Sequence, residues 1–97
     1  MLVLVSYDVS TESEGGRKRL RHVAKICQNH GVRVQFSIFE CHIDYAQLQS
    51  FRNELLNEID EERDSLRFYL LGNNFDRKVE HYGVKPSLNL SSDTLMI

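Results

Sequence analysis

Residues 32–43 read Val-Arg-Val-Gln-Phe-Ser-Ile-Phe-Glu-Cys-His-Ile, and the division of this stretch decides the fold. Its β-branched and aromatic residues are typical of a strand. Side-chain alternation predicts two faces: Val34, Phe36 and Ile38 on one, and Arg33, Gln35, Ser37 and Phe39 on the other. Taken whole, the stretch gives the element order β-α-β-α-β-β. Split into two strands, it gives β-α-β-β-α-β, and the residues alone leave both orders open.

The chain before this stretch predicts a strand, a loop and a helix. Leu2–Tyr7 is an almost continuous apolar run, which is typical of a central strand. A polar loop with Gly15 and Gly16 follows. A helix is expected from about Arg17 to His30, because Gly31 supplies a natural stop. Its apolar stripe has i, i+3, i+4 and i+7 spacing: Leu20, Val23, Ala24 and Cys27.

The chain after this stretch predicts a second helix and further strands. Asp44 has Gln47 three residues later, which indicates a capping box at a helix start. The apolar spacing of that helix predicts four buried residues: Leu48, Phe51, Leu55 and Ile59. A charged run, residues 60–64, ends the helix. Residues 65–71 and 79–82 have strand patterns, the second of them short.

This order predicts an α+β fold of the ferredoxin-like type, with two helices on one face of an antiparallel sheet and an additional C-terminal strand. In that arrangement the first strand is central and lies beside the third. We expect residues 1–83 to form the domain. Residues 84–97 form a C-terminal segment whose apolar content is unexpected for a disordered end: Leu88, Leu90, Leu95, Met96 and Ile97.

Composition points to one globular domain in a reducing compartment. The chain has 97 residues, of which 41% are hydrophobic and 27% charged, as in an ordinary globular protein. Because a chain of this length buries only a modest fraction of its surface, a second subunit would add stability. The apolar run at Met1–Val5 is too short for a signal peptide or a membrane span. Cys27 and Cys41 lack CxxC spacing and are expected to be buried free thiols, which favours a cytoplasmic location and no membrane partner. The histidines form no metal-binding motif.

Charge is distributed unevenly although the net charge is only −2. Residues 15–35 contain six basic residues and no acidic one, whereas residues 44–64 contain seven acidic residues and two arginines. A domain polarised in this way can hold a polyanion on one side. Arg17, Arg19 and Arg33 are candidates to hold phosphate oxygens. The alternative is a solvated positive face.

Asp8 is the main candidate for chemistry, because it ends an apolar strand where an unbonded carboxylate is costly to bury. It either caps the following loop or binds a hard cation such as Mg²⁺. A single carboxylate binds a metal ion only weakly. In a symmetric dimer, a twofold axis near the strand end would bring the two copies of Asp8 together. Phe39 either stacks on a base or packs in an interface, and packing is favoured.

Three motifs together resemble the CRISPR-associated protein 2 family. They are Tyr7-Asp8-Val9, the basic helix start Arg17-Lys18-Arg19-Leu20, and the string Arg-Val-Gln-Phe-Ser-Ile-Phe-Glu at residues 33–40. The helix and the Leu-Gly-Asn-Asn segment at residues 71–74 are most similar to members found with type I-C systems. The resemblance covers nearly the whole chain.

The resemblance implies a homodimer in which residues 84–97 pair with the partner's sheet. It implies that Asp8 binds Mg²⁺ or Mn²⁺, that Asp8 and Tyr7 are catalytic, and that the remaining family positions bind nucleic acid: Arg17, Arg19, Arg33 and Phe39. Members of the family are nucleases on RNA or double-stranded DNA, and they bridge copies of the CRISPR-associated integrase during spacer acquisition. The expected function is therefore a metal-dependent endonuclease acting in spacer acquisition on double-stranded DNA or single-stranded RNA.

Two other functions compete with this one. A non-catalytic scaffold would hold duplex DNA on the basic helix and the integrase elsewhere. Outside the family, a ferredoxin-like dimer can serve as a regulatory domain for a small metabolite. Steeply salt-dependent binding of nucleic acid would argue against the regulatory domain.

Overall fold

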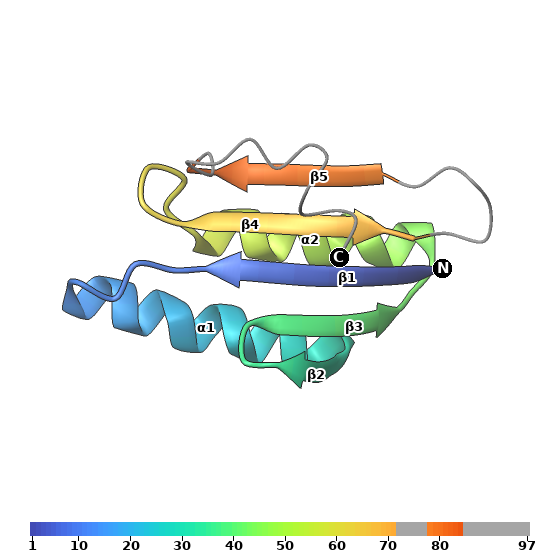
Figure 1. The fold of residues 1–97 in the computed structure, drawn as a ribbon, viewed down its shortest axis with the longest axis horizontal. Helices are drawn as coiled ribbons and strands as arrows, with labels where there is room; N and C mark the ends of the chain where they lie inside the picture. Colours follow the sequence, from blue (N-terminus) through green and yellow to red (C-terminus); the bar gives the residue numbers. More distant parts are fainter. Residues whose placement is uncertain (72–77, 85–97) are drawn as a thin grey trace.

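Five strands form one antiparallel sheet in the order β2-β3-β1-β4-β5 (Figure 1). The computed structural model describes residues 1–71 and 78–84. Its elements are β1 (Leu2–Asp8), α1 (Glu14–His30), β2 (Val32–Gln35), β3 (Ile38–His42), α2 (Tyr45–Glu58), β4 (Ser65–Leu70) and β5 (Lys78–Gly83). Both helices lie on the same face of the sheet (Figure 1). The predicted ferredoxin-like order is confirmed, with β1 central beside β3, and β5 is the additional strand. The C-terminal segment, including Leu88 and Leu90, lies outside the described residues.

Residues 32–43 are split into two strands by a tight turn at Phe36 and Ser37. The register of β2 on β3 shifts between Arg33 and Gln35, which is a bulge-like irregularity. The predicted alternation is therefore wrong across the turn. Phe36 is 92% exposed at the hairpin tip, whereas Phe39 is fully buried under the helices.

Helix α1 begins earlier than predicted, at Glu14, because Ser13 caps it by accepting a hydrogen bond from the Gly16 N–H. Gly16 is buried, and a Cβ there would lie 1.9 Å from the Ser10 carbonyl oxygen. The glycine pair that suggested a loop is thus inside the helix, and Gly16 lets the incoming loop approach it closely.

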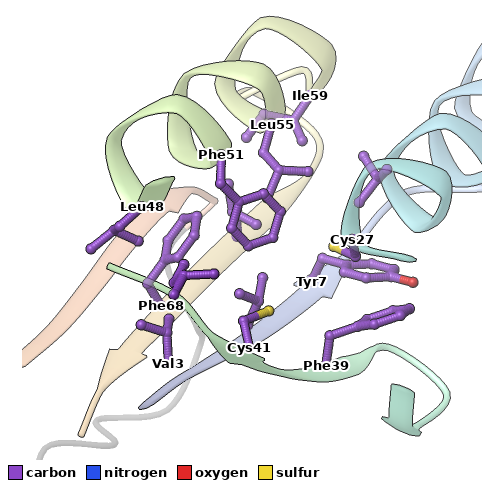
Figure 2. Close-up of a cluster of buried hydrophobic side chains, with 14 of the residues drawn as sticks. Val3, Tyr7, Cys27, Phe39, Cys41, Leu48, Phe51, Leu55, Ile59 and Phe68 are labelled. Atoms are coloured by element: carbon purple, nitrogen blue, oxygen red, sulfur yellow. The ribbon is translucent and has the colours of Figure 1, made fainter. Parts of the chain in front are cut away.

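The core lies between the sheet and the two helices (Figure 2). Val3, Val5 and Tyr7 alternate along β1 toward the helices, which is the period of a half-covered strand. The capping box of α2 is confirmed, since Asp44 Oδ1 accepts from the Gln47 N–H at 2.7 Å and Gln47 Oε1 accepts from the Asp44 N–H at 2.8 Å. All four residues predicted for its buried side are in the core: Leu48, Phe51, Leu55 and Ile59.

Both cysteines are free and buried, as predicted. Burial raises the pKa of the Cys27 thiol to about 12 and that of Cys41 to about 11, so both remain protonated at neutral pH. In the part of the chain that the structure describes, neither helix is long and apolar enough to cross a membrane.

Candidate functional site

Asp8 lies at the end of β1 with an exposed side chain. Because Tyr7 points into the core, alternation places Asp8 with Leu4 and Ser6 on the sheet face opposite the helices. In the sheet register Asp8 is paired with Ser65 at the start of β4. Asp8 is thus presented at one end of the sheet face opposite α1 and α2.

The capping role considered for Asp8 belongs to other residues. Ser13 caps α1, and Asp64 accepts the hydrogen bond from the Ser10 N–H in the loop that follows β1. Among residues 1–71 and 78–84, the Asp8 carboxylate has no hydrogen-bond or ion-pair partner. Its oxygens are consequently available to an outside ligand.

A hard divalent cation fits the chemistry of Asp8, because such ions prefer carboxylate oxygens. The described residues contain no group of three or more histidine, cysteine, aspartate or glutamate side chains able to hold a metal. In the described part of the chain Asp8 is therefore not joined by such a ligand group, and water, phosphate or a second subunit could supply further ligands.

The basic residues divide into two classes in the structure. Most of the α1 set is exposed: Arg17, Lys18, Arg21 and Lys25. Arg17 also approaches the Thr11 carbonyl oxygen, with Nη1 at 3.4 Å. This exposed row forms the positive face that the sequence predicts.

Arg19 differs from this row because it pairs with Asp64. Its Nε lies 2.8 Å from Asp64 Oδ2 and its Nη2 lies 3.1 Å from Oδ1, a two-pronged contact. The Arg19 side chain is 20% exposed and that of Asp64 is 0% exposed. Arg19 thus donates from two of its nitrogens within the chain, which sets it apart from the exposed arginines, and its predicted contact with phosphate stays a prediction.

Asp64 is not among the residues predicted for the site, because in sequence it is only the last member of the charged run that follows the second helix. Burial alone would raise the pKa of Asp64, but hydrogen bonds from Arg19 and from the Asp60 and Ser10 N–H groups lower it below its usual value. The only local signal is that Asp64 directly precedes an apolar strand. Its partner Arg19 is 45 residues away, so the pair requires the tertiary structure.

Tyr7, Phe39 and Arg33 form a second cluster beside the strand end. The Tyr7 and Phe39 rings are stacked, with centroids 6.2 Å apart (Figure 2). Burial raises the pKa of Tyr7, and the nearby Arg33 guanidinium acts in the opposite direction. Phe39 is 0% exposed, so the proposed stacking on a base is wrong for this conformation, and its packing role lies in the chain's own core. Arg33 remains exposed.

The sheet face that carries Asp8 is only partly polar. Its apolar residues come from all five strands: Val32 on β2, Ile38 on β3, Leu2 and Leu4 on β1, Tyr69 on β4 and Val79 on β5. Arg67 lies among them and donates to His81 Nδ1 from both Nε (3.3 Å) and Nη2 (3.1 Å), while His81 Nε2 donates to the Val84 carbonyl oxygen at 2.7 Å. A mixed apolar and hydrogen-bonded face of this kind resembles the composition of protein interfaces.

Comparisons with known proteins give a consistent family. A model of the CRISPR associated protein Cas2 family matches residues 1–79. The chain is 63% identical over 90 residues to a CRISPR-associated endonuclease Cas2 of Halalkalibacterium halodurans, covering 93% of this chain and 94% of that protein. It is 55% identical over 96 residues to a CRISPR-associated endoribonuclease Cas2 of Chlorobaculum tepidum, covering 99% and 100% respectively.

The fold comparison agrees with the sequence comparison. The crystal structure of Streptococcus pyogenes Cas2 at pH 6.5 superposes with a TM-score of 0.69 and 57% identity, covering 76% of this chain and 89% of that one. A hypothetical protein of Thermus thermophilus superposes with a TM-score of 0.58 at 25% identity.

Proposed function

Because this chain belongs to the CRISPR-associated Cas2 family, we propose that it is a homodimeric, divalent-metal-dependent endonuclease that takes part in spacer acquisition. The observation that carries the proposal is the position of Asp8, exposed at the end of β1 on the sheet face that the helices leave uncovered. The names of two relatives, an endonuclease and an endoribonuclease, support hydrolysis of phosphodiester bonds.

Dimerisation through the uncovered sheet face would complete the site. A twofold axis through that face makes the contact self-complementary, and it brings the two copies of Asp8 toward the same region when it passes near the ends of the two β1 strands. Two facing carboxylates repel each other unless a cation or a proton lies between them. The dimer thus converts one weak ligand into a pair that favours a divalent cation.

The residues of each chain have separate tasks in this proposal. Asp8 would hold the metal ion, which when bound activates water and neutralises charge on the phosphate. Arg17 and Arg33, both exposed, would hold the nucleic-acid backbone. Tyr7 is buried, so its task is to support the strand end and to orient Arg33. Mg²⁺ and Mn²⁺ both suit a carboxylate site.

The decisive experiment compares the wild type with Asp8→Ala, on double-stranded DNA and on single-stranded RNA, across a Mg²⁺ and Mn²⁺ titration. We expect a metal-dependent wild-type activity that EDTA removes and that Asp8→Ala loses. Glu12→Gln is the matched control, because Glu12 is an exposed carboxylate in the loop just after β1. Equal cleavage by Asp8→Ala and the wild type would attribute the activity to a contaminant. Light scattering on the same samples reports the dimer.

A scaffold without catalysis is the second candidate, and it is favoured by the small ligand set and the exposed basic row of α1. In this role the dimer holds duplex DNA on α1 and binds the CRISPR-associated integrase through another surface. Spacer acquisition by an Asp8→Ala strain separates the two candidates. Loss of acquisition with DNA binding and integrase binding intact would argue against a purely structural role.

A further inference from the structure

The Asp64 carboxylate is fully buried and fully hydrogen bonded. Oδ1 accepts from the Ser10 N–H at 3.0 Å and from Arg19 Nη2 at 3.1 Å. Oδ2 accepts from Arg19 Nε at 2.8 Å and from the Asp60 N–H at 2.9 Å. Each oxygen therefore has two donors, an arrangement that fixes the carboxylate in one orientation.

These donors come from three segments of the chain, two of which are far from Asp64 in sequence. They are the loop after β1, helix α1, and the turn between α2 and β4, which meet at the end of the molecule where β1 finishes (Figure 1). The end of β5 is attached at the same place, because the Val84 N–H donates to the Asp64 carbonyl oxygen at 2.9 Å. Gly83, with φ of 95°, permits this approach, since a Cβ there would lie 2.0 Å from that oxygen.

Asp8 lies between two backbone segments that are connected to Asp64, the loop after β1 and the start of β4. Its strand partner Ser65 directly follows Asp64, and Ser10, two residues after Asp8, donates to the Asp64 side chain. The Asp8 side chain has no partner of its own in the described part of the chain. The position of its carboxylate is consequently set by the backbone on both sides of it.

We propose that Asp64 and Arg19 act as one positioning pair for the Asp8 carboxylate, and that Arg19 is not a phosphate contact. The inference deepens the proposed function, on which its metal-binding part rests. Ligand positioning by residues outside the metal's own contacts commonly changes metal affinity without changing the ligand. The Nε and Nη2 side of the Arg19 guanidinium, one of its edges suited to a two-pronged contact with phosphate, already donates to Asp64.

The first test measures Mn²⁺ binding to the full-length dimer by electron paramagnetic resonance, which needs no cleavage. The variants are Asp64→Asn, Arg19→Ala, the double variant and Arg19→Lys, each checked for folding and dimerisation. We expect Asp64→Asn and Arg19→Ala to weaken Mn²⁺ binding about tenfold. The double variant should be no weaker than either single variant, because the pair acts as a unit. Arg19→Lys should recover part of the loss. If Asp64→Asn does not fold, Arg19→Ala and Arg19→Lys carry the test.

The second test measures the salt dependence of DNA binding without a metal. Arg17→Ala is the comparison, because Arg17 lies on the same helix and is exposed. Loss of a phosphate contact lowers the slope of log K against log salt by about one. We expect that change for Arg17→Ala and an unchanged slope for Arg19→Ala.

Two results would overturn the inference. One is a reduced salt slope for Arg19→Ala, which makes Arg19 a phosphate contact. The other is wild-type Mn²⁺ affinity in Arg19→Ala and Asp64→Asn while Asp8→Ala binds none. The proposed function fails differently, because its failure is a wild-type dimer that neither binds Mn²⁺ nor cleaves. In that case metal positioning is refuted as well, and the salt slope alone decides whether Arg19 contacts phosphate.

Discussion

The Arg33 guanidinium carbon lies 5.1 Å from the centroid of the Phe39 ring, so a basic residue of the edge strand covers a core aromatic residue. A cation over an aromatic face at this distance is a favourable contact. The same ring also stacks on Tyr7, which directly precedes Asp8 in β1, so Arg33 is connected through core aromatic rings to the strand that carries Asp8.

Phe36 and Phe39 should respond oppositely to truncation although they are three residues apart. Phe39→Ala removes a fully buried ring and should lower the free energy of unfolding by about 3–5 kcal/mol. Phe36→Ala changes a side chain that is 92% exposed and should alter that free energy by less than about 0.5 kcal/mol. Urea unfolding of the two variants measures both. A large effect of Phe36→Ala would instead place Phe36 in an interface.

The adjacent glycines of α1 provide a second matched pair. Gly16→Ala should lower the free energy of unfolding by about 1–3 kcal/mol, because its Cβ would meet the Ser10 carbonyl oxygen. Gly15→Ala meets nothing closer than 3.8 Å and should raise it by about 0.5–1 kcal/mol, the helix preference for alanine. Thermal unfolding followed by circular dichroism compares them. Equal effects of the two substitutions would contradict the close approach of the loop at Gly16.

Protonation of the Asp64 carboxylate should lower the free energy of unfolding in acid. Its pKa is lower in the folded chain than its ordinary value of 3.8, so the folded state is stabilised above about pH 4 and loses that contribution as the pH falls through the folded pKa. Asp64→Asn should cost about 1–3 kcal/mol at neutral pH, because the amide keeps one acceptor oxygen and the donors to the other oxygen, a backbone N–H and an Arg19 N–H, lose theirs.

The measurement is the thermal midpoint of the wild type and Asp64→Asn at several pH values. The gap between the two proteins should narrow as the pH is lowered below about 4. A gap that stays constant into strong acid would show that Asp64 is not an ionised acceptor in the folded state.

Tyr7 should not act as a general base near neutral pH. Burial raises the pKa of its hydroxyl above 10.0, so the hydroxyl is protonated throughout the range in which a nuclease would be assayed. Tyr7→Phe should lower the cleavage rate by a constant factor between about pH 6 and pH 9, with the shape of the pH profile unchanged. If the rising or falling part of the pH–rate profile disappears in Tyr7→Phe, Tyr7 takes part in proton transfer.

Local sequence determined most of the elements and the helix faces, although it left open how residues 32–43 divide and placed the start of α1 too late. The alternation of Leu2–Asp8 and the capping box at Asp44 specify a half-covered strand and a helix start through contacts between near neighbours. The exposed Asp8 at a strand end was located in the same way. The family motifs also consist of neighbouring residues, so the resemblance to the family can be recognised from the sequence alone.

Only the tertiary structure decided which charged and aromatic residues are available to a ligand. Phe36 and Phe39 are the same residue type and lie three positions apart. The turn between β2 and β3 leaves Phe36 exposed and Phe39 buried. Arg19 looks like Arg17 in sequence, but Asp64 lies beside it only because α1 and the start of β4 meet at one end of the sheet. Burial and pairing depend on contacts between residues far apart in the chain, and a local pattern carries no information about them.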